Sequence, residues 1–293
     1  MRLHTWNIFV LLCALACLNS CKEALLEPLG STTVRDSAVV VNHTSTNLSA
    51  IPEQWILKAK TDLHIAYGHT SHGSQLITGM DGLEGLKGSL YSFNATGSGG
   101  ALELRDTPFL AAYDLGNPDR TTWETATRAY LTSHREINVV IWAWCGEVST
   151  ATEADINIYL SLMNGLEHDY PKVSFVYMTG HLDGTGMTGN LYLRNQQIRT
   201  YATTYKKVLF DFADIESYNP DGAIFVDKFA NDNCDYDSDG NGSLDRNWAT
   251  DWQAAHPGQW YDCVPAHTQA LNGNLKAYAA WWLWARLAGW NGK

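Results

Sequence analysis

The sequence has little charge, and what it has is mostly acidic. Only 17% of the 293 residues are charged, and 20 Lys and Arg face 31 Asp and Glu, for a formal net charge of -11. A deficit of basic residues argues against nucleic acid and against an anionic membrane surface as partners. The hydrophobic fraction of 45% argues against disorder and predicts a large core.

A long apolar run that could cross a membrane is also missing. The run from Trp6 to Leu18 is too short to span a bilayer but has the length of a signal peptide. Leu18-Asn19-Ser20-Cys21 follows it and resembles the lipobox of bacterial lipoproteins. The resemblance implies a signal peptide over 1–21 and a lipid anchor on Cys21 as the only membrane contact. An ordinary secretory signal also fits. Either reading predicts export, and the lipobox places the chain in the bacterial cell envelope.

Cysteine is scarce, with six in the chain. Beyond residue 21 only Cys145, Cys234 and Cys263 remain, and an odd number leaves one thiol free. Cys234 and Cys263 lie in the polar, loop-rich final third, where a covalent link would be useful, so we predict a disulfide between them. Cys145 ends an apolar run and is expected to be buried and free.

No internal repeat is visible, and the pattern is one of alternating strands and helices. Expected strands are His64–Tyr67, Asn138–Trp144, Lys172–Met178 and Lys207–Phe210. Expected helices begin at Gln75 and cover Glu124–His134, Glu153–Glu167, Asn190–Tyr205 and Leu275–Leu287. Such alternation predicts a parallel sheet with right-handed crossovers.

The domain organisation follows from the same pattern. Residues 22–58 are rich in Ser and Thr and are predicted to be a tether, with a short strand at Ala38–Val41. Residues 59–293 are predicted to form one α/β domain, which is expected to be a monomer. An Asp-rich stretch near 231–246 interrupts the alternation of strands and helices and is predicted to be an insertion.

Ligands of parallel sheets bind beyond the carboxyl ends of the strands, so the turn His69-Thr70-Ser71-His72-Gly73 is the first candidate site. A serine between a strand and a helix exposes its hydroxyl and can direct its N–H at an oxyanion. His267, in a loop before the last helix, is the candidate base, and Asp262 would orient it. Alternatively, Ser71 or Thr70 only caps the helix.

This pattern, His-x-Ser-x-Gly after the first strand and a histidine in a late loop, resembles the SGNH/GDSL hydrolase superfamily. The resemblance implies a three-layer α/β sandwich with a mostly parallel, flavodoxin-like or SGNH-like sheet. It also implies an ester-cleaving triad with Ser71 as nucleophile and His267 as base. The oxyanion glycine would be Gly99 or Gly100.

The chain departs from the superfamily pattern at three places. His69-Thr70-Ser71 stands where the superfamily has Gly-Asp-Ser. Val264 stands three residues before His267, where an Asp is usual. Trp144-Cys145-Gly146-Glu147 replaces the block that carries the oxyanion-stabilising Asn, and Asn195 is our candidate substitute.

The resulting prediction is an exported serine esterase that removes acyl groups from a polysaccharide, a substrate inferred from the envelope location. Three alternatives stay open. Cys145 near a histidine is a candidate nucleophile. The chain is otherwise a non-catalytic glycan-binding lipoprotein, or a metal- or carboxylate-dependent carbohydrate enzyme. The candidate residues for binding a metal or a substrate under these alternatives are His69, His72, His181, Asp183 and His267.

A second kind of site is suggested by alternating oxygen side chains in the insertion. They are Asp235, Asp237, Asp239 and Asn241, with Asp245 following and Gly240 in the sixth position. This spacing resembles the calcium loop of EF-hands and predicts a structural Ca²⁺. A solvated acidic loop is the alternative. No organic cofactor is expected.

Overall fold

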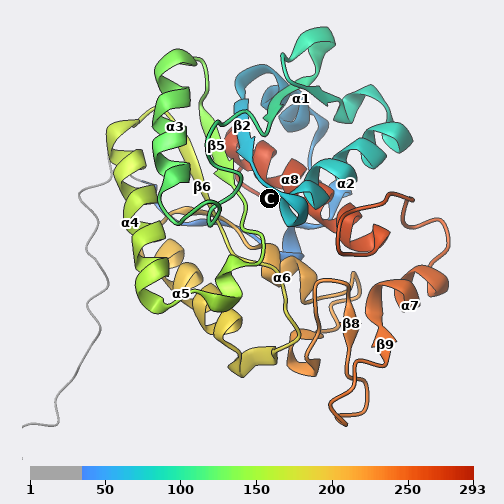
Figure 1. The fold of residues 1–293 in the computed structure, drawn as a ribbon. Coiled ribbons are helices and arrows are strands. Elements are labelled where there is room, and N and C mark those ends of the chain that lie inside the picture. The colour runs from blue at the N-terminus through green and yellow to red at the C-terminus, as the bar shows by residue number, and fades with distance from the viewer. Residues whose placement is uncertain (1–34) are drawn as a thin grey trace, which may run out of the picture.

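The computed structural model describes residues 35–293 and has a seven-stranded, fully parallel sheet at its centre (Figure 1). The strands are β1 (Val39–Val41), β2 (His64–Gly68), β3 (Phe93–Asn94), β4 (Leu102–Asp106), β5 (Val139–Trp142), β6 (Ser174–Met178) and β7 (Val208–Phe210). β2, β5, β6 and β7 are rich in β-branched and aromatic residues and are buried on both faces, as expected for a parallel sheet.

Helices cover both faces of this sheet. They are α1 (Glu53–Asp62), α2 (Ser71–Lys87), α3 (Thr122–Ser133), α4 (Glu153–Asp169), α5 (Asn190–Thr204), α6 (Phe212–Glu216), α7 (Trp248–Ala255) and α8 (Ala270–Leu287). One hydrophobic core joins the sheet to α1, α2 and α8, and a second joins it to α3, α4 and α5. Trp281 and Trp284 of α8 are fully buried in the first core. The predicted three-layer α/β sandwich is therefore confirmed.

The strand order places one crevice at the carboxyl edge. The order is β1-β7-β6-β5-β2-β4-β3, so the five strands β4-β2-β5-β6-β7 follow the flavodoxin-like order. The chain leaves β2 toward β4 on one side and later returns to β5 on the other. Loops after β2 and β5 therefore diverge, and this switch point is where doubly wound sheets bind ligands.

The folded domain begins earlier than the Ser/Thr-rich composition predicted. β1 pairs in parallel with β7, which confirms the short strand predicted near Ala38–Val41 and makes it an edge strand of the central sheet. Helix α1 also begins within the predicted tether over 22–58 and continues beyond it to Asp62. The proposed signal peptide, with Cys21, lies outside the described residues.

Two element predictions are corrected at the sheet. Helix α2 begins at Ser71, not at Gln75, so Ser71 and His72 are its first two residues. Strand β4, which pairs with β2, is missing from the strands expected from the sequence. The Asp-rich insertion contains a two-stranded ribbon of β8 (Asp235–Tyr236) and β9 (Arg246–Asn247).

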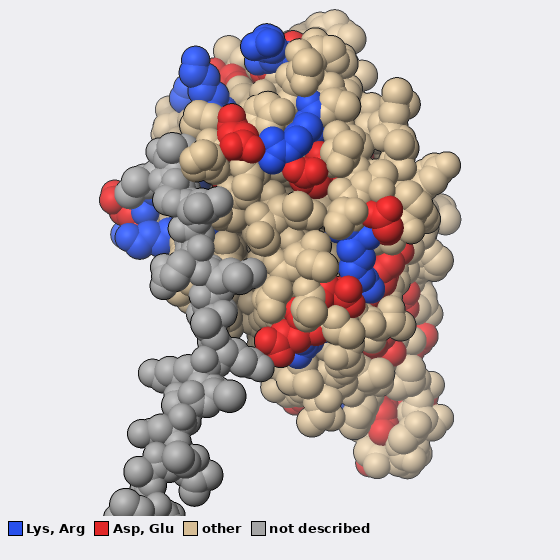
Figure 2. All heavy atoms as spheres, turned by 60° about the vertical axis from the view of Figure 1, so that its left-hand side comes forward, with Lys and Arg blue, Asp and Glu red and all other residues tan. Residues whose placement is uncertain are grey.

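The surface mixes charges of both signs. Figure 2 shows basic and acidic residues side by side on the face turned forward from the left of Figure 1. In α3, for example, Arg128 pairs with Glu124 and with Asp169 of α4. Within residues 35–293, every helix falls short of the length and apolar character needed to cross a bilayer.

Candidate active site

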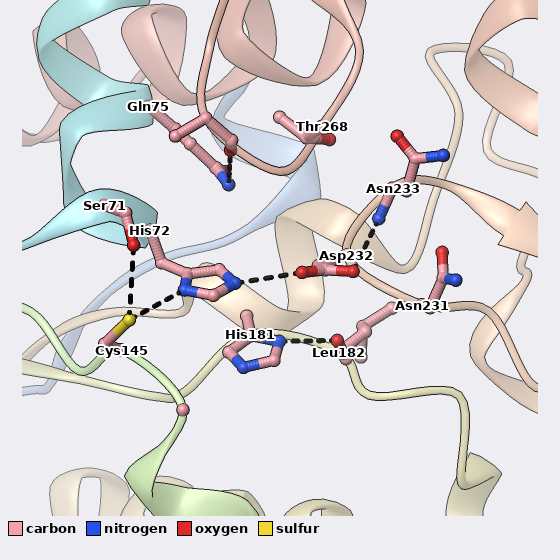
Figure 3. Close-up of polar contacts among 12 residues, drawn as sticks. Ser71, His72, Gln75, Cys145, His181, Leu182, Asn231, Asp232, Asn233 and Thr268 are labelled. Carbon is pink, nitrogen blue, oxygen red and sulfur yellow. Dashed lines mark hydrogen bonds and ion pairs between the residues drawn. The ribbon is translucent and has the colours of Figure 1, made fainter.

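The imidazole of His72 lies between a thiol and a carboxylate (Figure 3). Its Nδ1 is 3.1 Å from Sγ of Cys145, and its Nε2 is 2.9 Å from Oδ2 of Asp232. His72 belongs to the first turn of α2, Cys145 to the turn after β5, and Asp232 to the loop before β8. The three groups therefore come together from distant segments at the predicted crevice between β2 and β5.

The turn after β5 holds Cys145 in place. The backbone N–H of Cys145 donates to Oε2 of Glu147 at 2.9 Å, and the indole N–H of Trp144 donates to the Met178 carbonyl at 3.0 Å. Gly73 lets α2 come close to this turn, because a Cβ there would lie 2.4 Å from Cβ of His69 and 2.7 Å from Cβ of Ala143. A side chain at position 73 would separate His72 from Cys145.

The carboxylate of Asp232 is oriented from its other side. Its Oδ1 accepts a hydrogen bond of 2.9 Å from the backbone N–H of Asn233, which leaves Oδ2 facing His72. The preceding residue, Asn231, forms an isolated β-bridge with Asp183, which ties this loop to the segment after β6. The acceptor thus reaches His72 from a fixed backbone.

These contacts shift the protonation of both reactive groups. The hydrogen bond with His72 is the main cause that lowers the pKa of Cys145 to about 7; burial opposes it, and Ser71 and Thr70 add to the lowering. Burial opposes the charge of His72, but hydrogen bonds to Asp232 and Cys145 outweigh it and raise its pKa to about 9. Between these two values a thiolate and an imidazolium coexist, which is the state of an activated cysteine.

The ring of His72 is also held between two other imidazoles. The His181 ring stacks on it with centroids 3.9 Å apart, and the His267 ring stacks with centroids 4.4 Å apart. Nδ1 of His181 is 2.6 Å from the Leu182 carbonyl, which can only accept, so this nitrogen carries a proton. His267 has a positive φ of 64°, a conformation that costs energy in a residue other than glycine. The stack restricts rotation of His72 about its side chain.

The N-terminus of α2 lies next to the thiol. Thr70 is the N-cap residue, but its hydroxyl donates to Asp114 at 2.7 Å and it makes no side-chain capping bond to the helix. The Oγ of Ser71 is 3.4 Å from Sγ of Cys145. Within residues 35–293, the N–H groups of Ser71, His72 and Gly73 make no hydrogen bond, as is usual for a first helical turn. They are available to a negatively charged oxygen beside Cys145.

The catalytic residues predicted from sequence are only partly brought together. Ser71 and His267 both adjoin His72, since Ser71 precedes it and His267 stacks on it. Among the residues described, however, Ser71 has no hydrogen bond to His267, whose ring is instead exposed on the outer side of the stack. Asp262 is exposed and makes no hydrogen bond to His267 within residues 35–293. The hydrogen-bonded chain runs through Cys145, His72 and Asp232.

The oxyanion candidates taken from the family resemblance lie elsewhere. Gly99 and Gly100 precede β4, and the parallel register pairs the start of β4 with the start of β2, at the amino edge of the sheet. Ser71 follows β2 at the carboxyl edge, so these glycines are on the opposite side of the domain from it. Asn195 is buried in α5, where its Oδ1 accepts from the Gly180 N–H at 2.8 Å. It supports the turn after β6 and does not face Cys145.

The remaining polar candidates have separate partners. Nε2 of His69 lies 2.6 Å from Oδ1 of Asp106, at the end of β4. The carboxylate of Asp183 accepts hydrogen bonds from the N–H and hydroxyl of Thr185 and closes a local turn. Of the five residues considered for metal or substrate contacts, His72, His181 and His267 thus gather at one place.

Three side chains lie close enough together to share a metal ion, but the orientation of two of them does not suit one. Within residues 35–293, His72, His181 and Asp232 have ligand atoms within 4.8 Å of one another. The rings of His72 and His181 are nearly parallel, at 9°. Nitrogen lone pairs lie in the ring planes, so two stacked imidazoles cannot both direct one at a single ion about 2 Å away. A metal here would require one ring to rotate.

A cavity of about 450 Å³ opens at the carboxyl ends of β2 and β5. Aromatic and aliphatic side chains form much of its wall, among them Phe109, Leu110, Tyr113 and Trp142, with His69 at its border. Asp114 directly follows the wall residue Tyr113 and accepts a hydrogen bond from the hydroxyl of Thr70, the residue before Ser71. An apolar substrate group therefore has room beside the segment that leads into α2.

The predicted disulfide between Cys234 and Cys263 is absent, and both residues are free thiols. Each sulfur has its own surroundings: Sγ of Cys234 is 3.4 Å from the Thr268 hydroxyl, and Sγ of Cys263 is 3.6 Å from the Ala270 carbonyl. Burial raises the pKa of Cys234 to about 12 and that of Cys263 to about 11. Cys145 is therefore the only described thiol with a lowered pKa.

The Asp-rich loop is organised around Asp237. Its carboxylate accepts backbone N–H groups of Gly240 at 2.8 Å, Asn241 at 3.2 Å and Gly242 at 2.8 Å. Asp235 instead accepts from the side chains of Asn233 and Asn247. A loop counted from Asp237, with Gly242 sixth, thus fits the hydrogen bonds better than one counted from Asp235. The calcium site itself stays a prediction.

Comparison of the chain with protein-family models, with curated proteins and with solved structures gives no match. The resemblance to SGNH/GDSL hydrolases therefore stays a prediction. The sequence pattern does not single out Asp232, because its neighbours Asn231 and Asn233 and the following Asp residues look like a loop. Cys145 and His72 each follow a predicted strand, so the sequence places both at the same edge of the sheet. Sequence alone does not show which histidine contacts the thiol.

Proposed function

We propose that the protein is a cysteine-dependent acyl hydrolase in which Cys145 is the nucleophile, His72 the acid and base, and Asp232 the group that orients His72. The observation that carries the proposal is the position of the His72 ring, 3.1 Å from the thiol on one side and 2.9 Å from the carboxylate on the other. Nucleophile, base and orienting acid in this order are what acyl transfer requires.

In the first half of the reaction the Cys145 thiolate attacks the acyl carbonyl and forms a C–S bond. The His72 imidazolium then gives its proton to the leaving group, and the bond from the carbonyl carbon to that group breaks. This leaves a thioester on Cys145. Asp232 stabilises the imidazolium before it gives up the proton, because its carboxylate stays ionised. Burial acts to raise the pKa of Asp232, but the hydrogen bond from His72, together with smaller favourable contributions that include the Asn233 N–H, outweighs burial and lowers it.

In the second half neutral His72 removes a proton from water, and the hydroxide attacks the thioester. The C–S bond breaks, the acid leaves, and the thiolate–imidazolium pair returns. Both halves pass through a negatively charged oxygen, which needs hydrogen-bond donors. The free N–H groups of Ser71, His72 and Gly73 and the Ser71 hydroxyl are our candidates for these donors.

Ser71 is the competing nucleophile predicted from sequence. A serine hydroxyl needs a base within hydrogen-bond reach, but the Ser71 hydroxyl faces the Cys145 sulfur at 3.4 Å and not an imidazole. A thiol with a pKa of about 7 is already about half ionised at neutral pH, whereas a serine hydroxyl is not ionised there. These two facts favour Cys145. The acylated glycan, inferred from the envelope location, remains our proposed substrate class.

Turnover of p-nitrophenyl acetate by matched variants tests the proposal. Cys145→Ala should abolish turnover, and His72→Ala should lower kcat/KM by about 10²–10⁴-fold, the usual contribution of a general acid and base. Ser71→Ala should keep the nucleophile and lose only one stabilising contact. Full activity in Cys145→Ala together with none in Ser71→Ala would instead establish the serine esterase.

Metal-dependent hydrolysis is the second candidate, because His72, His181 and Asp232 are close enough to share an ion. It predicts that a strong chelator abolishes activity and that Zn²⁺ restores it. The cysteine mechanism predicts the reverse, since Zn²⁺ would compete for His72 and Asp232 and inhibit. The stacked rings favour the cysteine mechanism.

A further inference from the structure

A buried ion pair joins α6 to α8. Lys276 of α8 is 0% exposed and Glu216, the last residue of α6, is 1% exposed. Nζ of Lys276 lies 2.5 Å from Oε1 of Glu216, and it also donates to Oε1 of Gln75 in α2. Charges are costly to bury unless they are paired and hydrogen-bonded, so this cluster of Gln75, Glu216 and Lys276, called here the polar hub, needs every one of its bonds.

One arm of the polar hub reaches His181. The second oxygen of Glu216, Oε2, accepts the backbone N–H of Leu182 at 2.8 Å. The carbonyl of the same Leu182 receives the proton on Nδ1 of His181 at 2.6 Å. Glu216 therefore holds the backbone of Leu182, and the carbonyl of this same residue sets the orientation and the proton position of the His181 imidazole.

The other arm reaches His267. Nε2 of Gln75 donates to the carbonyl of Ala266 at 2.6 Å, and His267 is the next residue. This bond anchors the loop exactly where the backbone enters the positive φ of His267. Gln75 also follows His72 by one turn of α2, so the hub holds the central imidazole through its own helix.

We propose that Gln75, Glu216 and Lys276 are positioning residues, which hold the rings of His181 and His267 against His72 and so keep His72 aligned between Cys145 and Asp232. None of the three contacts the thiol. Each acts through a backbone group or through the helix that carries a ring. The inference rests on the proposed cysteine chemistry and adds residues to it that the sequence does not suggest.

The charges around the polar hub determine how substitutions of its residues are interpreted. Burial acts to lower the pKa of His72, and the charge of Glu216 helps to raise it, after the larger contributions of the hydrogen bonds to Asp232 and Cys145. Lys276 has a pKa lowered mainly by burial, opposed by Glu216, with smaller contributions from Cys234 and Asp232. Glu147 is a further carboxylate near the thiol, and it accepts a hydrogen bond from the backbone N–H of Cys145. Changing Glu216 thus alters charge and position together, whereas changing Gln75 alters position alone.

A matched pair elsewhere provides the control. Lys207 is paired with Glu167, with side chains 3% and 9% exposed, and Lys207 also donates to Asn164 at 3.0 Å. Lys207 precedes β7 and therefore lies at the amino edge, away from Cys145. Glu167→Gln removes a comparable buried charge without touching any residue of the stack.

The test is the pH dependence of Cys145 alkylation by iodoacetamide in the full chain, followed by peptide mass spectrometry. Glu216→Gln has one acceptor oxygen where Glu216 uses two, one for Lys276 and one for Leu182. Gln75→Met loses the bonds to Ala266 and Lys276 but leaves the Lys276–Glu216 ion pair in place. Both should move the alkylation profile to higher pH and slow the reaction at pH 7 by up to about tenfold per unit of pKa. Glu167→Gln should keep the wild-type profile.

Two results would overturn the inference: folded Glu216→Gln and Gln75→Met proteins with the wild-type profile, or an equal shift in Glu167→Gln. If Glu216→Gln does not fold, Gln75→Met decides by itself. Failure of the cysteine chemistry looks different. In that case wild-type Cys145 would itself react with the profile of an ordinary thiol, before any variant is compared.

Discussion

The Nδ1 atom of His72 faces the sulfur of Cys145 at 3.1 Å, although the two residues are 73 positions apart in the chain. The parallel sheet brings them together, because β2 and β5 are neighbours and both end at the same edge. A helix beginning directly after β2 and a turn directly after β5 then place the ring against the thiol. The reactivity of Cys145 should depend on this one contact.

Replacing His72 by Gln should make Cys145 an ordinary thiol. The hydrogen bond with His72 is the largest cause of its lowered pKa, so without the imidazolium the pKa of Cys145 should rise from about 7 toward the ordinary value of a cysteine thiol. Alkylation of Cys145 at pH 7 should slow by roughly tenfold or more. Peptide mapping also follows Cys234 and Cys263, whose raised pKa values predict slow labelling in every variant. Unchanged labelling of Cys145 in His72→Gln would contradict the pairing.

The activity should show a bell-shaped pH profile. Below about pH 7 the thiolate gains a proton, and above about pH 9 the imidazolium loses one, so kcat/KM should rise across the first value and fall across the second. A neutral amide at position 232 no longer favours the imidazolium. Asp232→Asn should therefore move the alkaline limb to lower pH, toward the ordinary value for histidine. A rate that continues to rise above pH 9 would exclude His72 as the acid.

The core between the sheet and α8 should dominate stability. Trp284 is 0% exposed, and Trp284→Ala should lower the free energy of unfolding by about 3–5 kcal/mol through lost contacts and a cavity. Leu110, at 84% exposed, is the matched control, and Leu110→Ala should stay within about 0.5 kcal/mol. Urea unfolding followed by tryptophan fluorescence measures both. Equal effects would mean that α8 is not packed as described.

Removing calcium tests the Asp-rich loop. If Ca²⁺ binds there, its addition should raise the Tm, since a ligand bound only to the folded state stabilises it. A chelator should reverse the gain. Asp237→Ala should abolish the response, because this carboxylate gathers the N–H groups of Gly240, Asn241 and Gly242. Asp183→Ala, in a turn outside the loop, should keep it. A Tm indifferent to calcium would leave the loop as a hydrogen-bonded turn.

The sequence predicted the three-layer fold better than it predicted which side chains of the site form hydrogen bonds with one another. Apolar runs such as Val139–Trp142 are strong local signals, and their alternation with helices sufficed for the sheet. β4 gave a weaker signal, because Glu103, Arg105 and Asp106 interrupt its apolar residues and pair with groups outside the strand. The turn after β2 was correctly placed at the ligand edge. Such patterns report local conformation and burial.

The partners within the site follow from long-range geometry, which local patterns do not contain. Asp232 meets His72 across 160 positions, and Gln75 meets Lys276 across 201. The family resemblance favoured Ser71 and His267, and both do lie beside His72. The hydrogen bonds, however, belong to Cys145 and Asp232. Cys234 and Cys263 were paired for their similar surroundings, yet each is enclosed by different neighbours.

The most direct test is to identify the acylated residue. The full chain is mixed with p-nitrophenyl acetate near pH 7, quenched in acid within one turnover, digested and examined by mass spectrometry. The account predicts an acetyl group on Cys145 that hydroxylamine removes, and that is absent from a His72→Gln sample treated in parallel. An acetyl group on Ser71, with Cys145 unmodified, would contradict it.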